Sequence, residues 1–92
     1  MTKKFKDTFT VINEKGLHTR PSTELVKCAS SFKSRVSLQY QDLNVDAKSL
    51  LGILMLAAAR GAQITVEAIG DDAEEAVKAI IELATNKFYI QY

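Results

Sequence analysis

Hydrophobic and polar residues alternate in four short stretches of the chain, a period of two that is typical of strands with one buried face. In the first stretch Phe5, Phe9 and Val11 share one side, which only Asp7 interrupts. The second and third stretches are separated only by residues 41–42, Gln-Asp, which favours a tight turn. The pattern therefore predicts strands over residues 4–12, 35–40, 43–46 and 63–69.

Three other stretches repeat apolar residues at intervals of three and four, the spacing of one helix face. Pro21 suits the first turn of the first helix, where a missing N–H costs nothing. Ser49 stands where a side-chain oxygen could cap the second helix. Acidic residues open the third helix, in agreement with the helix dipole. The predicted helices run from residue 21 to about 31, from 50 to a stop at 60–61, and from an opening at 70–72 along an apolar stripe over 73–84.

These elements follow the order β-α-β-β-α-β-α within 92 residues, enough for one domain with a modest core. Alternating strands need one face covered, and two of the helices carry matching apolar stripes. We therefore expect an α+β fold, a two-layer open-faced sandwich with helices on one face of an antiparallel sheet. The domain spans residues 1–92, with a tail over 1–3 and an aromatic tail over 88–92 that could pack on the domain or contact a partner.

Composition and charge narrow the classes of function. A formal net charge of +1 gives no reason to expect nucleic acid as a partner. With one cysteine, Cys28, and one histidine, we expect no disulfide and no zinc site, and Cys28 to pack as a small core residue. The longest apolar stretch, residues 50–59, is too short to cross a bilayer, and no signal peptide is visible. We expect a cytoplasmic monomer that binds no metal or cofactor.

Residues 16–23, Gly-Leu-His-Thr-Arg-Pro-Ser-Thr, carry the clearest candidate chemistry. A helix that starts at the proline offers unpaired N–H groups and a partial positive charge, which suit a phosphoryl dianion. Arg20 can bind phosphate oxygens in a fork, and the imidazole of His18 is a nucleophile available near pH 7. There is no Gly-rich phosphate loop, so we expect no bound nucleotide. The motif predicts that His18 accepts a phosphoryl group and that Arg20 stabilises it.

The same motif resembles the active site of HPr, the histidine phosphocarrier of the bacterial phosphotransferase system. Residues 44–56 resemble that family's regulatory-serine segment, and the resemblance runs from about Phe5 to about Phe88. It implies a four-stranded sheet in the order 1-4-2-3, covered on one face by three helices. The chain departs from the family at Ser22, where alanine is common and where we expect the hydroxyl to act only as a cap.

The resemblance also implies a reaction. Enzyme I, charged by phosphoenolpyruvate, would phosphorylate Nδ1 of His18 to give a pros-phosphohistidine, and an enzyme IIA would receive the group in sugar uptake. The protein would then be a carrier and not an enzyme with its own turnover. The resemblance further implies that HPr kinase/phosphorylase phosphorylates Ser49 where the organism has that kinase, although a helix cap already explains this serine.

The second predicted helix is apolar nearly all round, yet a short helix on a sheet can bury only one side. We expect Ile53 and Leu56 in the core, and Leu50, Leu51 and Leu54 in an exposed patch of the kind that docks partners. Two cations elsewhere, Lys27 and Lys48, are solvated charges by default, although either could help to dock an acidic partner.

Two alternative functions stay open at this point. In the first, a nitrogen-branch or regulatory paralogue uses the same His18 chemistry without moving sugar. In the second, the chain is an interaction module that binds through Leu51 and Leu54 while His18 is idle. Phosphorylation by enzyme I would exclude the second alternative.

Overall fold

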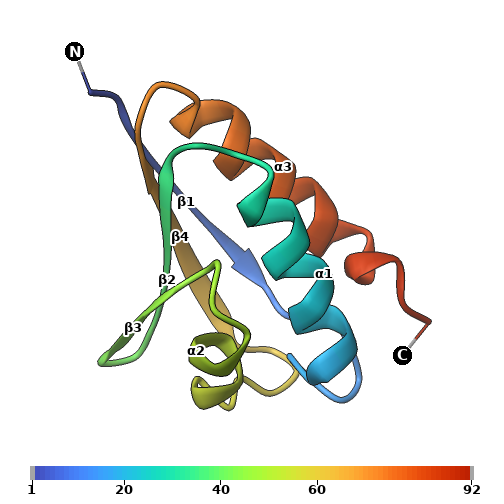
Figure 1. The fold of residues 1–92 in the computed structure, drawn as a ribbon. Coiled ribbons are helices and arrows are strands. Elements are labelled where there is room, and N and C mark those ends of the chain that lie inside the picture. Colours follow the sequence, from blue (N-terminus) through green and yellow to red (C-terminus); the bar gives the residue numbers. More distant parts are fainter. Residues whose placement is uncertain (1, 92) are drawn as a thin grey trace.

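The computed structural model describes residues 2–91 and has the predicted alternation of strands and helices (Figure 1). A short 3-10 turn, η1, follows the last helix. The elements are β1 (Lys4–Thr10), α1 (Thr19–Ser30), β2 (Arg35–Tyr40), β3 (Leu43–Asp46), α2 (Leu50–Met55), β4 (Gln63–Ile69), α3 (Ala73–Thr85) and η1 (Lys87–Tyr89).

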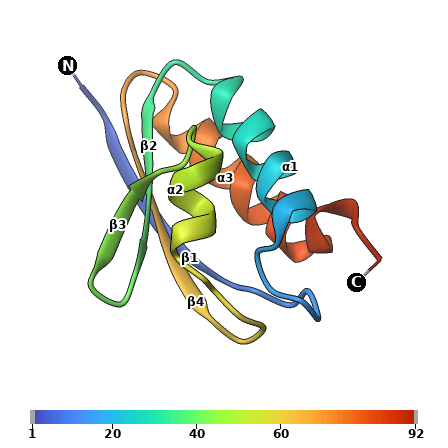
Figure 2. The ribbon, with the colours of Figure 1, turned by 60° about the horizontal axis from the view of Figure 1, so that its bottom comes forward.

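The four strands form one antiparallel sheet in the order β1-β4-β2-β3, so that β1 and β3 are its edges. The helices lie on one side of the sheet, with α1 and α3 side by side and α2 next to β3 (Figures 1 and 2). This arrangement confirms the predicted α+β open-faced sandwich and the sheet order implied by the resemblance.

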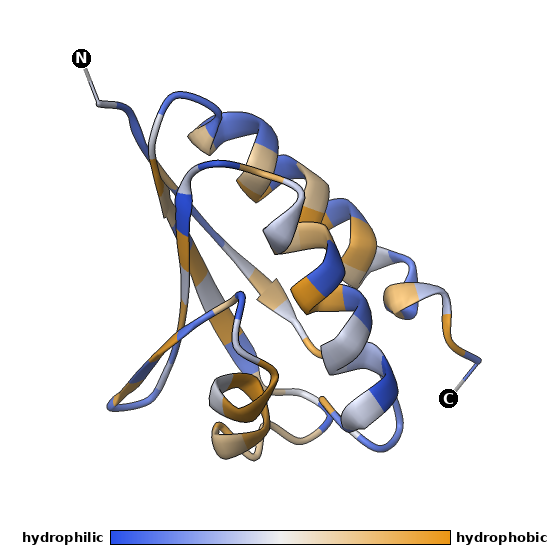
Figure 3. Cartoon of the chain, in the orientation of Figure 1, coloured by the Kyte–Doolittle hydropathy of each residue, from blue (hydrophilic) through white to orange (hydrophobic). Residues whose placement is uncertain are grey.

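Alternation along the strands places one set of apolar side chains beneath the helices. Phe9 of β1 is in register with Ile64 of β4, and Leu38 of β2 with Val66 of β4, and all four are buried. The apolar stripes of α1 and α3, visible as orange bands in Figure 3, close over this face. The helices contribute Leu25, Ala29, Ile53, Ala73, Ala76, Val77, Ile80, Leu83 and Ala84 to the buried core.

The first helix begins at Thr19, two residues before the predicted start at Pro21. Its first turn is closed by the N–H of Ser22, which donates to the carbonyl of His18 at 3.0 Å. Pro21 is therefore the third helical residue, a position whose N–H has no partner within the helix in any case. The proline supports the first turn without marking its first residue.

Two elements end earlier than predicted. β1 stops at Thr10, although the next residue, Val11, still forms backbone hydrogen bonds with the loop before β4. α2 stops at Met55, because Ala57 adopts a left-handed φ of 50° that a right-handed helix cannot pass through. The predicted stop at residues 60–61 is therefore wrong.

Cys28 lies at the margin of the core and not inside it. Its side chain is half-buried and packs against the core beside other partly buried groups such as Val26 and Phe32. This partial burial raises the pKa of the Cys28 thiol, because the thiolate loses solvation. The prediction that Cys28 packs in the core is therefore correct only in part, because the side chain contacts the core but remains partly exposed.

The C-terminal segment folds back on the domain through a left-handed turn. Lys87, Phe88 and Tyr89 have φ values of 55°, 56° and 57°, a conformation that residues with a Cβ rarely adopt in succession. Phe88 is fully buried and meets Phe9 edge to face, with ring centroids 6.1 Å apart. Burial of the ring holds the strained turn against the domain.

Candidate functional site

The loop before α1 is pressed against the segment that follows α2. Gly16 has a φ of 69°, and a Cβ built on it would lie 2.3 Å from the carbonyl oxygen of Ala58, so only glycine fits there. The next residue, Leu17, is buried and donates its N–H to the same carbonyl at 2.9 Å. These contacts fix the loop immediately before His18.

His18 is the N-cap residue of α1, and its side chain is exposed. The backbone is extended, with φ −71° and ψ −176°, and the imidazole makes no capping bond to the helix. The N–H groups of Thr19 and Arg20 lie in the first turn, at the positive end of the helix dipole. An anion attached to the imidazole would meet a favourable field here.

A shallow hollow of about 400 Å³ surrounds His18. Lys15, Thr19 and Leu54 line it together with the short run of alanines at 57–59. Leu54 was predicted in a docking patch and His18 as a phosphoryl acceptor, and the fold brings both to one depression. Lys15 was missed by the sequence reasoning, although its position three residues before His18, beside the turn glycine, was a signal that could have found it.

Arg20 is exposed in the second position of α1 and borders a neighbouring hollow. Thr19 lines both this hollow and the one around His18, so the two are adjacent. The far wall consists of Phe88, Tyr89 and Ile90, which lie beside the N-terminal half of α1 (Figures 1 and 2). The C-terminal turn is therefore part of the surroundings of the candidate site.

The outer side of α2 carries four apolar side chains, which we call the α2 patch: Leu50, Leu51, Leu54 and Met55. The exposed fractions are 70% for Leu51 and 66% for Met55, whereas Leu54 is half-buried. Figure 3 shows α2 coloured hydrophobic along nearly its whole length. Met55 was not predicted, although it lies four residues after Leu51 and hence on the same helix face.

The inner side of α2 follows the prediction: Ile53 and Leu56 are buried. The prediction that Ser49 caps the helix is also confirmed, because its Oγ accepts a hydrogen bond from the N–H of Gly52 at 3.0 Å. Ser49 is half-buried and lies at the N-terminal end of α2, directly before Leu50 of the α2 patch.

The two predicted docking cations are both engaged within the protein. Lys48 donates from Nζ to the carbonyl of Phe32 at 2.9 Å, which ties the start of α2 to the end of α1. Lys27 lies 3.3 Å from the carboxylate of Glu24, one turn earlier on α1. The pair on α1 is exposed enough to contribute little to stability, and docking of an acidic partner by Lys27 or Lys48 stays a prediction.

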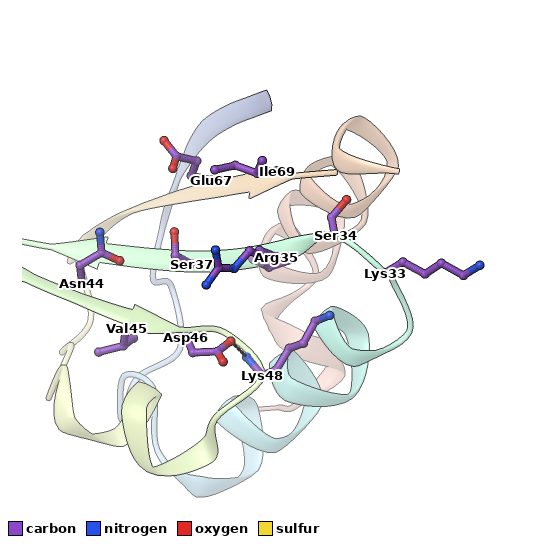
Figure 4. A pocket seen from close by; sticks show the side chains of 11 residues that line it. Lys33, Ser34, Arg35, Ser37, Asn44, Val45, Asp46, Lys48, Glu67 and Ile69 are labelled. Atoms are coloured by element: carbon purple, nitrogen blue, oxygen red, sulfur yellow. Dashed lines mark hydrogen bonds between the residues drawn. The ribbon is translucent and has the colours of Figure 1, made fainter. Parts of the chain in front are cut away.

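Another hollow lies on the open face of the sheet, beyond the C-terminal end of α1 (Figure 4). It combines Arg35 and Lys48 with the carboxylates of Asp46 and Glu67, and Figure 4 shows Lys33 pointing away from it. The 12 residues of α1 separate this place from His18 by about 18 Å of helix. Because it carries charges of both signs and lies far from His18, we do not include this hollow in the candidate site.

The same end of α1 is anchored by Asp72, which precedes α3. Its carboxylate accepts hydrogen bonds from the N–H groups of Lys33 and Ser34, each at 2.9 Å, and from the hydroxyl of Ser34. The hydroxyl of Ser34 and these backbone donors hold the pKa of Asp72 below its ordinary value.

Ser22 does not act as the cap that was expected. It is fully buried in the first turn of α1, and its Oγ donates to the carbonyl of Leu17 at 3.0 Å. The hydroxyl thus bonds to the loop before the helix and not to a helical N–H.

Within residues 2–91, no group of three His, Cys, Asp or Glu side chains is placed to hold a metal ion. Every helix among those residues is too short or too polar to reach across a lipid bilayer.

Known protein families and structures include several that are similar to this chain. The family model described as the PTS HPr component phosphorylation site matches residues 5–86. The phosphocarrier protein HPr of Cupriavidus necator is 43% identical over 79 residues, which cover 86% of this chain and 89% of that protein.

Two solved structures from Thermoanaerobacter tengcongensis are also similar. The crystal structure of HPr-C-His has a TM-score of 0.91 at 36% identity and covers 96% of this chain and 99% of that one. The crystal structure of an HPr dimer has a TM-score of 0.75 at 39% identity and covers 87% and 92%.

Proposed function

This chain belongs to the HPr family of phosphocarrier proteins of the phosphotransferase system, and from that membership we propose that His18 is its phosphoryl acceptor. The observation that carries the proposal is the exposed imidazole at the N-terminus of α1, with Arg20 in the second helical position. Nδ1 of His18 attacks the phosphorus held by enzyme I, which phosphoenolpyruvate has charged. The N–P bond forms as the bond to enzyme I breaks.

The openness of the site suits a carrier. The phosphoryl group on His18 would be stabilised by the helix N-terminus and by Arg20, without a closed pocket. It therefore remains accessible to a second protein, an enzyme IIA of sugar uptake. In that transfer the N–P bond on His18 breaks as a bond to enzyme IIA forms. We propose that the protein works as a single domain, as a monomer and in the cytoplasm, and that it carries the group without turnover of a small molecule.

The α2 patch supports a shared docking surface for enzyme I and enzyme IIA. Leu54 lines the hollow around His18, and Leu51 and Met55 extend the apolar surface outward from it. A partner that covers this patch would also cover the imidazole. Burial of exposed leucine and methionine side chains would contribute to the affinity, and charged residues are not needed at its centre.

Ser49 is the proposed regulatory residue, modified by HPr kinase/phosphorylase where that enzyme is present. A phosphate there adds about two negative charges. The N-terminus of α2 tolerates such a charge, but the adjacent Leu50 and Leu51 would lose their value as an apolar contact. Phosphorylation of Ser49 would thus block docking while the fold is kept.

The test is incubation with enzyme I and phosphoenolpyruvate, followed by intact mass. We expect one phosphoryl group, labile in acid and stable in base, on wild type and none on His18→Ala. An acid-labile group retained by His18→Ala would overturn the assignment of His18. Comparison of onward transfer to sugar-branch and nitrogen-branch IIA proteins separates the carrier from a nitrogen-branch or regulatory paralogue.

A matched pair of α1 variants tests the role of Arg20. Arg20→Ala should slow transfer at saturating enzyme I, while Lys27→Ala, which removes another exposed cation of the same helix, should not. Loss of one positioned donor costs about 100- to 1,000-fold in closed sites, and this open site should show the lower end of that range or less. Equal loss of binding and of transfer in Arg20→Ala would mean that Arg20 only docks the partner.

A further inference from the structure

We propose that the buried hydroxyl of Ser22 positions His18 for phosphoryl transfer, an inference that rests on the proposed function of His18. Among the described residues only three polar side chains are buried, those of Asn13, Ser22 and Ser34. The hydroxyl of Ser22 has no solvent exposure and donates to the carbonyl of Leu17 at 3.0 Å. That carbonyl belongs to the peptide unit that joins Leu17 to His18.

Ser22 also holds the peptide unit on the other side of His18. Its backbone N–H donates to the carbonyl of His18 at 3.0 Å. One residue therefore fixes both peptide planes that flank His18, one through its side chain and one through its backbone. Because those planes define φ and ψ of His18, they also define the direction of its Cα–Cβ bond.

The backbone half of this clamp is available to any residue at position 22, but the hydroxyl half requires a donor side chain. Without it, Leu17 keeps its buried side chain and its N–H bond to Ala58 at 2.9 Å, both on the side of the residue away from the carbonyl that faces His18. The peptide plane between Leu17 and His18 would then lose the hydrogen bond at its carbonyl and tilt more easily. The exposed side chain of His18 makes no capping bond to the helix that would oppose such a tilt.

The direction of the His18 Cα–Cβ bond matters for transfer. The phosphoryl group must contact Arg20 and the first helical N–H groups while the imidazole lies in line with the phosphoryl donor, enzyme I. A displacement of about 1 Å can cost 100-fold in rate. We expect Ser22→Ala to lose about 2- to 12-fold in kcat for transfer from enzyme I, which corresponds to one neutral hydrogen bond. KM should not change, because Ser22 is buried and cannot touch the partner.

Ser34→Ala is the matched control. Ser34 is the other buried serine, and its hydroxyl bonds to Asp72 at the opposite end of α1. Both variants remove a buried hydroxyl, so both should lower the melting temperature, and only Ser22→Ala should lower kcat. Rates are measured well below both melting temperatures. If both variants slow transfer equally, the loss follows stability, and the positioning role is wrong.

A second measurement needs no phosphorylation. The backbone order parameter of His18, measured by NMR on the unmodified protein, should fall in Ser22→Ala and stay unchanged in Ser34→Ala. An unchanged order parameter, or an unchanged kcat, in Ser22→Ala would overturn the inference. Absence of phosphohistidine in the wild type would instead overturn the proposed function, so the two failures are distinguishable.

Discussion

Replacement of Phe88 by alanine should release the C-terminal turn while the rest of the domain stays folded. Three contributions hold the turn in place: the buried ring of Phe88, the buried side chain of Ile90, and the hydrogen bond from Asn13 Nδ2 to the carbonyl of Lys87 at 2.9 Å. Loss of a buried phenylalanine costs about 3–5 kcal/mol, burial of an isoleucine contributes about 1.5–3, and one hydrogen bond about 1.

The left-handed backbone of the turn opposes these contributions. Three residues with φ values of 55–57° cost about 1–2 kcal/mol each, or about 3–6 in total. At the centres of these ranges the docked turn is favoured by roughly 2–3 kcal/mol, and removal of the ring makes it unstable. Since undocking releases the strain, Phe88→Ala should cost about 2–3 kcal/mol, less than the usual penalty for a buried phenylalanine.

Urea unfolding and thermal melts measure this loss. At about 4–8 °C per kcal/mol, the melting temperature should fall by roughly 8–24 °C. The N–H of Ile90, which bonds to the carbonyl of Lys87 at 3.0 Å, should lose its protection from hydrogen exchange while the strands keep theirs. Tyr89→Ala is the control, because its side chain is 70% exposed and should change stability by less than about 0.5 kcal/mol.

Lys87→Gly tests the strain itself. Glycine adopts this backbone freely, so the variant should be about 0.5–1 kcal/mol more stable than wild type after the entropy of glycine is subtracted. The reasoning is refuted if Phe88→Ala melts like wild type, or if Lys87→Gly is destabilised.

Three further predictions concern the surface. Leu51→Glu should keep the melting temperature, since the side chain is 70% exposed, and weaken binding to enzyme I measured by calorimetry; unfolding would mean that Leu51 belongs to the core. Ser49→Asp should slow His18 phosphorylation and keep the cap, whereas Ser49→Ala should transfer normally and lose about 1 kcal/mol of stability; an Asp variant as fast as wild type would reduce Ser49 to a cap. Because the pKa of Asp72 is lowered on folding, its carboxylate stabilises the protein above the ordinary value of 3.8, and this stability is lost as pH falls through the lower folded value. Acid titration of the melting temperature should therefore show a smaller fall below pH 3.8 in Asp72→Asn than in wild type, and equal curves would refute the role of Asp72.

Sequence periodicity was sufficient to locate the four strands and the two longer helices, but β1 ends two residues before its predicted end and α1 begins two residues before its predicted start. β2, β3 and β4 have their predicted bounds, because alternation at period two and the turn between β2 and β3 are local signals. The end of α2 was not predictable in this way. Residues 56–59 continue an apolar, helix-compatible sequence, and the chain leaves the helix through a left-handed residue, Ala57, which no local propensity marks.

The composition of the candidate site was predictable, and its surroundings were not. His18 and Arg20 lie two residues apart in one short motif, so the motif was enough to find them. Lys48 bonds to Phe32 across 16 residues, and the wall of Phe88, Tyr89 and Ile90 beside Arg20 depends on the packing of α3 against α1. Such contacts between distant segments are set by tertiary packing, which leaves no periodic trace in the sequence.

The hollow lined by both His18 and Leu54 limits the rate at which this protein can deliver phosphoryl groups. If donor and acceptor both cover that one depression, they exclude each other, and each delivery requires complete departure of the previous partner. Protein association rate constants are about 10⁵–10⁷ M⁻¹s⁻¹, so the number of deliveries per second depends on the lifetime of each complex. A carrier that exchanges partners about 100 times per second must hold each with a Kd of roughly 10–1,000 μM. Variants that enlarge the α2 patch and tighten binding would therefore be expected to reduce flux.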